Sequence, residues 1–397
     1  MEYNAMCGLF FYILCFTEII LGNSSNSTKP DKIKIKLGFV APLDNRLAAT
    51  ATLGRELDSV FRLAIEVIND RARKEGSKIE LETDFSSQVK DSGYNDRYQC
   101  REIAKQFVAD SKIVGVVGAF RSSCSIKLNQ YFKTKSRTLT QISYGSTAIE
   151  LSDKLNYPRF FRTVPSDIHQ AEALADIIKM YKWKKVSTIA TGDRDGQDFA
   201  NAFQNEMKKR NVNVVDSARF NRGDTSQIVQ QKVEQIKKGE TRINVISALP
   251  NDALTAFHQV QQLGMTGEGW VWLVSDKVAS APLRNEPALK EAMNGLVGLT
   301  VKAGSGAKYL DLLVLWLQKE EGKYPGVIWS YDEPQMSLFA PQVYNAVSAY
   351  FKAFDKLARR GIIQPGESYT RLRNIVYDEL KAFNAPDKQN GFESATG

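Results

Sequence analysis

The chain has 397 residues, of which 43% are hydrophobic and 25% are charged. This composition is typical of a globular protein with two or three domains and excludes a largely disordered chain. The four cysteines are too few for a disulfide-dense scaffold, and the two histidines leave little material for a histidine-rich metal site.

Basic residues outnumber acidic ones by 53 to 45, which gives a net charge of +8. The densest basic runs are Lys182, Lys184 and Lys185, and Lys208, Lys209 and Arg210. Both runs lie at the polar end of a predicted helix, so a solvated helix end is the simplest interpretation. No basic stripe interleaved with aromatic residues is visible in the sequence, and we therefore expect no nucleic-acid partner.

The first 22 residues are predicted to be a signal peptide. Residues 7–16 form an apolar run that suits a signal-peptide core and is too short to span a membrane comfortably. No Lys or Arg precedes it and Glu18 follows it, so a buried N-terminal strand is the alternative. Two glycosylation sequons begin at Asn23 and Asn26, within a segment over 23–32 that we expect to be flexible. We therefore expect a secreted or extracellular chain.

From Ile33 onward, short apolar runs alternate with helical patterns. In the first part, strands are predicted over 35–40, 79–84, 113–118 and 138–142, and helices over 53–70, 98–110 and 123–132. After a predicted connection over 160–165 the rhythm restarts. Helices are then predicted over 168–181, 196–210, 225–238 and 252–263, and strands over 185–191, 212–217, 243–248 and 270–275. This alternation predicts an α/β protein with two mainly parallel sheets flanked by helices.

The last third of the chain is predicted to be mostly helical. A strand over 296–301 precedes helices over 309–321, 336–359 and 370–383. We expect these helices to pack back on one of the two sheets. No apolar run long enough to span a membrane follows the predicted signal peptide.

Common catalytic and nucleotide-binding motifs are absent from the sequence. There is no G-x-x-x-x-G-K-[ST] loop, no G-x-G-x-x-G, no H-E-x-x-H and no G-x-S-x-G. We therefore expect neither cofactor nor metal, and no enzyme activity. Ser122, Asp167 and His169 still supply the residue types of a nucleophile and a base, which leaves an enzyme as the rival. The tripeptide Arg222-Gly-Asp224 is interpreted as a turn, with Asp224 capping the helix that follows.

Two segments of small hydroxylated residues each follow a predicted strand and precede a helix. The first contains Ser122 and Ser123, and the second contains Ser146 and Thr147. Backbone N–H groups at a helix start attract anions, and serine hydroxyls add donors. Together the two segments could hold the two oxygens of one carboxylate. Ordinary helix capping is the alternative for both.

The stretches QISYGSTAIELSD (141–153) and YPRFFRTVPSD (157–167) resemble the signature region of class C G-protein-coupled receptor ectodomains. That family includes the metabotropic glutamate and GABA type B receptors. Its ectodomain is a Venus flytrap, similar to type I periplasmic amino-acid-binding proteins. The resemblance covers about residues 33–392 and is most specific over 118–183.

The resemblance implies a two-lobed domain that closes over a ligand in the cleft between its lobes. Lobe 1 would comprise 33–162 and 303–385, lobe 2 would comprise 166–298, and 386–397 would be a truncated tail. It also implies a homo- or heterodimer through lobe 1. The hairpin, cysteine-rich segment and seven helices of the full receptors are missing from this sequence. A secreted module, a splice product and an incomplete gene model therefore all stay open.

Site residues follow from the resemblance by position. Ser122, Ser146 and Thr147 would hold the α-carboxylate of an amino acid. Asp167 and Asp276 would meet its α-ammonium, and Asp276 is expected to be an exposed acid that follows the strand over 270–275. Helix capping for Asp167 and a surface loop for Asp276 are the alternatives.

Departures from the family pattern bear on the ligand. The aromatic residue that packs on the ligand in glutamate-type receptors falls at Asp195. The basic residues that hold the side chain of glutamate fall near Leu57 and Phe339. An amino acid with a small or apolar side chain therefore fits better than glutamate, and a ligand-free partner or decoy subunit is the alternative.

Cys100 and Cys124 are the cysteines that remain once the predicted signal peptide is removed. An even pair in a secreted chain suggests one disulfide, and two buried thiols are the alternative. The resemblance implies a bridge here, which would brace the segment that carries Ser122.

Overall fold

The computed structural model describes residues 31–44, 48–93, 96–135, 139–279, 295–301, 307–318 and 336–383. The predicted signal peptide, the sequons at Asn23 and Asn26, and the predicted tail 386–397 lie outside the described residues. The chain divides into two units, 1–31 and 32–397, and the second is the one described below.

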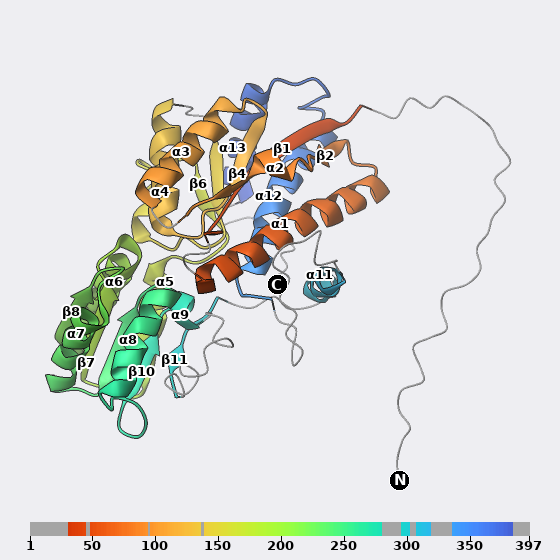
Figure 1. Cartoon of the computed structure of the whole chain (residues 1–397). Coiled ribbons are helices and arrows are strands. Elements are labelled where there is room, and N and C mark those ends of the chain that lie inside the picture. Colours follow the sequence, from red (N-terminus) through yellow and green to blue (C-terminus); the bar gives the residue numbers. More distant parts are fainter. Residues whose placement is uncertain are drawn as a thin grey trace, which may run out of the picture. The chain divides into compact units, whose positions relative to one another are not determined.

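The first sheet is parallel throughout and has the strand order β2-β1-β4-β5-β6, with β3 paired to the end of β1 (Figure 1). Its strands are β1 (Ile33–Ala41), β2 (Ile79–Leu81), β3 (Val89–Asp91), β4 (Ile113–Val117), β5 (Thr140–Ser143) and β6 (Phe160–Arg162). Strand β1 is paired along both edges, and eight of its nine residues are buried. Burial on both faces explains the continuous apolar run over its last five residues, Leu37 to Ala41.

Helices from both ends of the chain pack around the first sheet. They are α1 (Ala48–Lys74), α2 (Phe85–Gln88), α3 (Asp96–Ala109), α4 (Ser122–Lys135), α11 (Ala307–Leu317), α12 (Ala340–Arg359) and α13 (Tyr369–Phe383). Helices α1 and α12 share one hydrophobic core with β1. The buried hydroxyl of Tyr350 on α12 donates a hydrogen bond of 2.7 Å to the carbonyl of Thr140 on β5. The late helices therefore pack against the first sheet.

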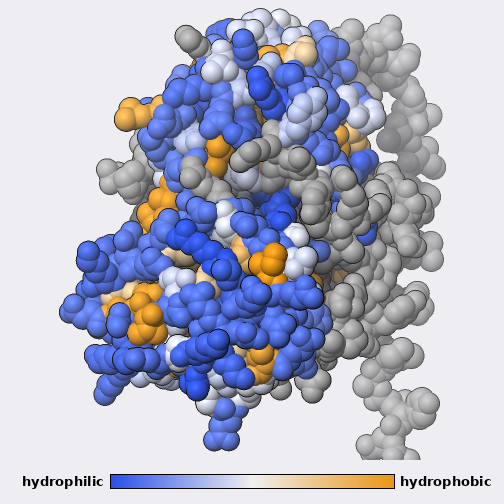
Figure 2. Space-filling view, turned by 60° about the vertical axis from the view of Figure 1, so that its left-hand side comes forward, coloured by the Kyte–Doolittle hydropathy of each residue, from blue (hydrophilic) through white to orange (hydrophobic). Residues whose placement is uncertain are grey.

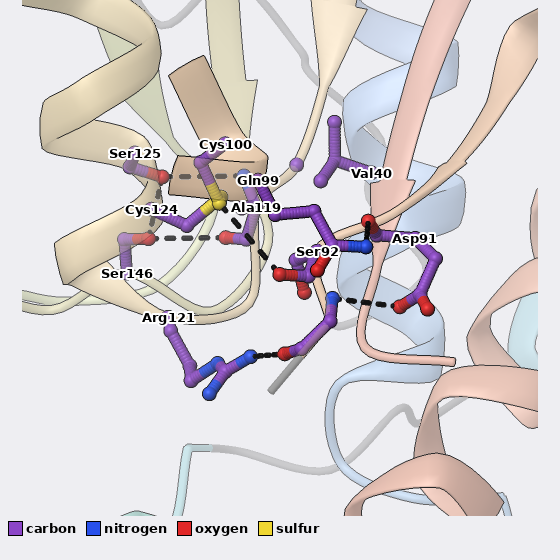
Figure 3. The surroundings of a disulfide bond; sticks show 12 residues. Val40, Asp91, Ser92, Gln99, Cys100, Ala119, Arg121, Cys124, Ser125 and Ser146 are labelled. Carbon is purple, nitrogen blue, oxygen red and sulfur yellow. Dashed lines mark hydrogen bonds between the residues drawn. A yellow bond between two sulfur atoms is a disulfide. The ribbon is translucent and has the colours of Figure 1, made fainter. Parts of the chain in front are cut away.

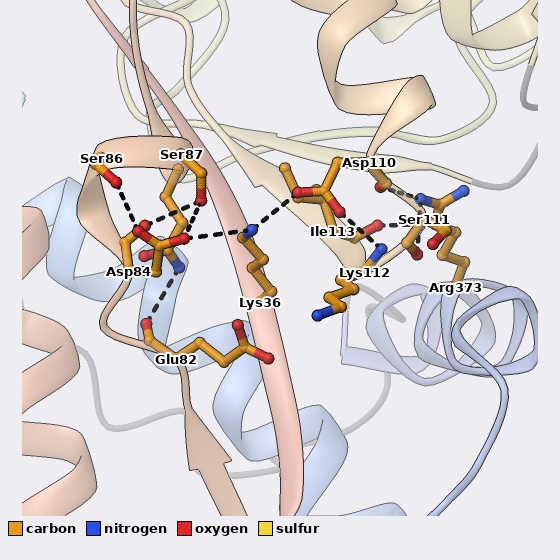
Figure 4. A network of polar contacts seen from close by, with 11 residues as sticks. Lys36, Glu82, Asp84, Ser86, Ser87, Asp110, Ser111, Lys112, Ile113 and Arg373 are labelled. Atoms are coloured by element: carbon orange, nitrogen blue, oxygen red, sulfur yellow. Dashed lines mark hydrogen bonds and ion pairs between the residues drawn. The ribbon is translucent and has the colours of Figure 1, made fainter.

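A buried lysine on β1 forms a polar network beside the same core (Figure 4). The ammonium of Lys36 donates to Asp110 over 2.8 Å and lies 3.8 Å from Asp84. Burial opposes the charge of Lys36, but the hydrogen bond to Asp110 and the nearby carboxylates outweigh it and raise its pKa. Arg373 on α13 donates to the carbonyl of Ile113 over 2.8 Å, which fastens the last described helix to the start of β4.

The second sheet is also parallel, with the order β11-β10-β9-β7-β8. Its strands are β7 (Lys185–Thr191), β8 (Asn213–Phe220), β9 (Ile243–Ser247), β10 (Val271–Val274) and β11 (Val297–Gly298). Its helices are α5 (Asp167–Met180), α6 (Arg194–Lys209), α7 (Ser226–Lys238), α8 (Pro250–Gln262) and α9 (Asp276–Ala279). Separate hydrophobic clusters cover its two faces. The predicted fold class, two parallel sheets flanked by helices, is confirmed.

Several local predictions were wrong. Residues 160–162 form strand β6, which pairs with β5, so only the remainder of the predicted connection over 160–165 is irregular. The strand predicted over 79–84 ends at Leu81, and that predicted over 296–301 is reduced to 297–298. The short elements α2 and β3 were not predicted, because three or four residues cannot display a periodic pattern.

Within the ranges described, no helix combines the length and the apolar character needed to cross a membrane. Figure 2 shows one face of the surface, on which small hydrophobic patches are separated by hydrophilic side chains.

Candidate ligand-binding site

The loops that follow β4 and β5 meet at the carboxyl end of the first sheet. Gly118 has a φ of +122°, and a Cβ atom there would lie 2.6 Å from the carbonyl oxygen of Val40. A Cβ atom on Gly145 would lie 2.6 Å from the ring of Phe120 and 2.9 Å from its carbonyl oxygen. Glycine at position 145 therefore allows the loop after β5 to approach the loop after β4, and glycine at position 118 allows the loop after β4 to pass close to the end of β1.

Serine hydroxyls join these two loops. The hydroxyl of Ser122, the first residue of α4, accepts a hydrogen bond of 3.1 Å from the backbone N–H of Ala148. The hydroxyl of Ser146 lies 2.7 Å from that of Ser125 and donates to the carbonyl of Ala119 over 3.0 Å. Three of the predicted carboxylate-binding residues, Ser122, Ser146 and Thr147, are buried here, whereas Ser123 is half-buried.

A disulfide holds the start of α4 to α3, as predicted. Cys100 and Cys124 are bonded, with their Cα atoms 5.4 Å apart. Figure 3 shows that this bridge lies beside the loop that carries Arg121 and close to Ser125 and Ser146. Because Cys124 is two residues beyond Ser122, the bridge anchors the helix turn on which Ser122 lies.

Asp167 lies at the start of α5 and is buried. Its backbone N–H donates to the carbonyl of Thr147 over 2.9 Å, so α5 begins directly against the second serine loop. The N-cap position is held by Ser166 and not by Asp167. The guanidinium of Arg162 donates to the carbonyl of Ala148 over 3.0 Å. Burial lowers the pKa of Arg162, and the charge of Asp167 opposes that effect.

Asp276 is buried, with 2% of its surface exposed, and the expectation of an exposed acid was wrong. The chain does not enter an open loop after β10 but turns at once into the short helix α9. The backbone N–H of Asp276 donates to the side-chain oxygen of Gln170 over 3.1 Å, and the Gln170 amide donates to Asp167 over 3.3 Å. The two predicted ammonium-binding carboxylates are thus linked through one glutamine.

Two buried cations at this site were not predicted. Lys277 follows Asp276, has 5% of its surface exposed, and carries its ammonium 5.9 Å from the centre of the Phe120 ring. Arg121 lies between Phe120 and Ser122, is buried, and donates to the carbonyl of Gly93. Periodicity does not identify a buried cation, but the position of Lys277 beside a predicted ligand-binding acid could have indicated it.

These contacts, together with links along the chain, form a closed ring through loops and helix starts next to both sheets. In order, the ring runs through Ser122, Ala148, Thr147, Asp167, Gln170, Asp276, Lys277 and Phe120. Four of the predicted ligand-binding residues therefore lie on this ring, Ser146 lies beside it in the same loop as Thr147, and Ser123 is adjacent to Ser122. Asp195 lies in the first turn of α6, but its side chain is outside the described residues.

Two of the positions that depart from the family pattern are apolar and buried. Leu57 and Phe339 belong to the core of the first sheet. The Phe339 ring meets that of Phe120 edge to face, with the ring centres 5.0 Å apart. Phe339 is therefore a core aromatic residue that supports the Phe120 loop.

A second group of charges follows strands β7, β8 and β9. Arg222 pairs with Asp193 over 2.9 Å and lies 3.7 Å from Asp252. Burial raises the pKa of Asp252 to about 6, with Asp193 adding to the effect and Arg222 and Arg121 opposing it. The expectation that Asp224 caps α7 was wrong: Thr225 is the cap, and Asp224 accepts from the backbone of Asn221 instead.

No group of three or more His, Cys, Asp or Glu side chains that could hold a metal ion occurs within the described ranges. The site consists of hydroxyls, backbone amides, two carboxylates and two cations, a set suited to a small zwitterionic molecule.

Fold and site together define a type I periplasmic-binding-like ligand-binding domain. The family described as "Receptor family ligand binding region" matches residues 56–384, and the chain belongs to this family. The predicted relationship to class C receptor ectodomains is confirmed.

Several receptors are similar to this chain. It is 29% identical over 201 residues to the extracellular calcium-sensing receptors of Sus scrofa and Homo sapiens, which covers 51% of this chain and 18% of each receptor. It is 27% identical over 271 residues to glutamate receptor 3.1 of Oryza sativa subsp. japonica, which covers 68% of this chain and 27% of that receptor. The chain therefore matches less than a third of the length of these relatives.

Proposed function

We propose that the chain is an extracellular ligand-binding domain of the class C receptor type that binds a small amino-acid-like ligand. The ligand would lie in a cleft between lobe 1, residues 33–162 with 303–385, and lobe 2, residues 166–298. The observation that carries this proposal is the ring of contacts that joins Ser122, Thr147, Asp167 and Asp276.

The ligand carboxylate binds at the start of α4. Ser122 and Ser123 offer hydroxyls and helix-terminal N–H groups there, and Ser146 and Thr147 approach from the next loop. A helix start favours an anion through its unsatisfied N–H groups and its dipole. Ser146 exchanges the hydrogen bond that it donates to Ala119 for one to the carboxylate, and Ser122 donates to the carboxylate while it still accepts from Ala148.

The ligand ammonium binds between Asp167 and Asp276. Both acids are buried, and an ammonium placed between them would form charge-assisted hydrogen bonds in a medium of low dielectric constant. Since Asp167 begins α5 and Asp276 begins α9, this end of the ligand is held by lobe 2.

The two lobes close on the ligand because each of them binds one of its ends. Lobe 1 binds the carboxylate first, and lobe 2 then closes over the ammonium. A ligand shifts the equilibrium towards the closed state only by the difference between its affinities for the two states. In a dimer formed through lobe 1, this closure would reorient the partner subunit.

The side chain of the ligand is small or apolar. Leu57 and Phe339, where glutamate-type receptors carry cations, are apolar. Calcium is the second candidate ligand to be tested, because the name of the calcium-sensing relatives states it.

A ligand-free partner or decoy subunit is the alternative, and Lys277 favours it. Its ammonium already reaches the Phe120 ring from the side of the second sheet. A contact of this kind can hold the two lobes together without a ligand.

An enzyme gains no support from the site. His169, the rival's base, is exposed on α5, and its ring nitrogen lies 3.3 Å from Glu172. Asp167 is buried and accepts a hydrogen bond from the side-chain amide of Gln170.

A thermal-shift screen tests the proposal. The chain is melted with each of the twenty amino acids, with GABA and with calcium. For every hit, the matching amine without the carboxylate and the matching acid without the amine are added. A true ligand at 100 times its dissociation constant stabilises the fold by about 2.7 kcal/mol. The amine and the acid should each stabilise it far less. A cooperative melt that no compound shifts would contradict the proposal and favour the ligand-free subunit.

A further inference from the structure

The four helix-to-strand connections of the second sheet lie at the amino end of its strands, opposite the candidate site. In a parallel α/β sheet the helices end where the next strands begin, so these connections all lie at the amino end of the sheet. They are the segments between α5 and β7, α6 and β8, α7 and β9, and α8 and β10 (Figure 1). We call these four connections, with the helix ends and strand starts that they join, the amino rim.

Three hydrogen bonds join neighbouring connections of the amino rim. The N–H of Asn213 donates to the carbonyl of Lys184 over 2.9 Å. The hydroxyl of Thr241 donates to the carbonyl of Lys185 over 2.9 Å, and the N–H of Val271 to that of Arg242 over 2.9 Å. The rim is therefore one continuous structure across β8, β7, β9 and β10, and spans roughly 15 Å at the usual strand spacing.

Basic residues gather on this rim from runs that are separate in the sequence. They are Lys179, Lys182, Lys184, Lys185, Lys208, Lys209, Arg210, Lys237, Lys238 and Arg242. Lys185 pairs with Glu240, Lys209 with Glu206, and Arg210 with Asp176 and Glu206. No carboxylate of the described chain pairs with the other seven. Glu268 is the further acid exposed in these connections.

Aromatic residues alternate with these cations. Tyr181 and Trp183 stack with their ring centres 4.9 Å apart, and the guanidinium of Arg242 lies 4.3 Å from the ring centre of Trp270. The side chains of Met180 and Tyr181 are 67% and 59% exposed. Cations at helix ends complement the helix dipole, but that effect does not account for exposed aromatic and apolar groups beside them. The fold therefore brings basic and aromatic residues together into a stripe that is not visible in the sequence.

We propose that the amino rim binds a linear sulfated polysaccharide. A row of cations that pair with no carboxylate, placed along the amino end of the sheet, complements a chain that carries anionic groups at regular intervals. The choice of a sulfated polysaccharide among polyanions rests on the extracellular location in the proposed function. The binding itself does not depend on the amino-acid site, which lies at the other end of the sheet.

Two other polyanions fit the rim less well. Proteins that bind single-stranded nucleic acid stack bases on open aromatic faces, but each of the three rim rings already has a face covered by a neighbour. A membrane surface needs a broad apolar face to insert, and the apolar faces of the helices around this sheet are packed on it. Met180 and Tyr181 alone are a small insertion surface.

The test measures binding of heparin to the full chain as a function of sodium chloride concentration. The rim variant carries Lys184→Ala, Lys208→Ala and Lys238→Ala, three exposed residues in or directly before three neighbouring connections. The control variant carries Lys34→Ala, Lys74→Ala and Lys78→Ala, which are exposed around the first sheet and remove the same charge. The amino-acid melt shift is recorded for each protein, so failure of the rim and failure of the ligand site are distinguishable.

We expect the rim variant to bind heparin about tenfold or more weakly, with a salt dependence smaller by about two to three in slope. The control variant should bind as the wild type does, and heparin without its sulfates should not bind. Equal weakening in both variants, or no heparin binding at all, would overturn the proposal. Tighter binding to single-stranded DNA or to vesicles with an anionic lipid than to heparin would assign the rim to that partner instead.

Discussion

The side-chain oxygen of Gln170 accepts a hydrogen bond from the backbone N–H of Asp276, 3.1 Å away. The same side chain donates to Asp167 over 3.3 Å. One glutamine on α5 therefore sets the positions of both acids to which we assign the ligand ammonium. Neither acid was expected to depend on it.

Replacing Gln170 by Met, which has a similar volume but no amide, should destabilise the fold by about 1–3 kcal/mol. The cause is the loss of two buried hydrogen bonds, one from the N–H of Asp276 and one to the carboxylate of Asp167. Urea unfolding measures the change. Gln262→Met, at an exposed position on α8, is the control and should change stability by less than about 0.5 kcal/mol. Equal effects of the two substitutions would show that Gln170 does not have this role.

Loss of the bridge between Cys100 and Cys124 should destabilise the fold. The double substitution to Ser opens a loop of about 25 residues, and closing such a loop is worth about 3 kcal/mol in the chain-entropy account. A reductant added to the wild type should lower its melting temperature towards that of the double variant, and should leave the variant itself unchanged. A wild type that melts at the same temperature with and without complete reduction would contradict this.

Gly145→Ala should damage the site more than its size suggests. The added methyl group would lie 2.9 Å from the backbone carbonyl of Phe120, which cannot move without shifting the Ser122 loop. We expect a loss of about 1–3 kcal/mol in stability. Gly192→Ala is the matched control, because its methyl group meets the flexible side chain of Asn221. A Gly145 variant as stable as the Gly192 variant would show that the two loops can separate freely.

Asp252 should make stability depend on pH between about 4 and 6. Burial raises its pKa to about 6 in the folded chain, so the folded state takes up the proton more readily than the unfolded state does. The contribution is therefore fully present below pH 4 and is lost as the pH rises through 6. The loss corresponds to about 3 kcal/mol.

The comparison with Asp252→Asn isolates this group. The amide variant cannot ionise, so its stability relative to the wild type should rise between pH 4.5 and pH 7. Arg222 loses a partner at both values, which leaves the pH-dependent difference intact. Parallel stability curves for the two proteins over this range would refute the assignment.

Most of the fold could be predicted because its elements are long and periodic. The strand over 185–191 was predicted to the residue, and the helices over 225–238 and 370–383 to within one residue. Short elements failed, and so did Phe160–Arg162, whose apolar character resembles that of a buried connection. Pairing with β5 depends on residues distant in sequence, which local patterns do not contain.

The candidate site also contains residues that local sequence patterns can identify and residues that they cannot. Residues that follow strands in a recognisable motif, such as Ser122 and Ser146, lie in neighbouring loops, and their role in ligand binding stays a prediction. Lys277 and Gln170 could not, because their roles depend on how α9 and α5 pack against other parts of the chain. The amino rim is a similar case: its basic runs were visible, but their assembly into one edge is a property of the fold.

The most direct test of the central claim is the melting temperature of three proteins, wild type, Ser122→Ala and Asp276→Asn, with each of the twenty amino acids. Our account predicts that at least one amino acid stabilises the wild type and that each substitution abolishes most of that shift, because one removes a carboxylate donor and the other an ammonium acceptor. A shift that survives in both variants would place the ligand elsewhere and contradict the account.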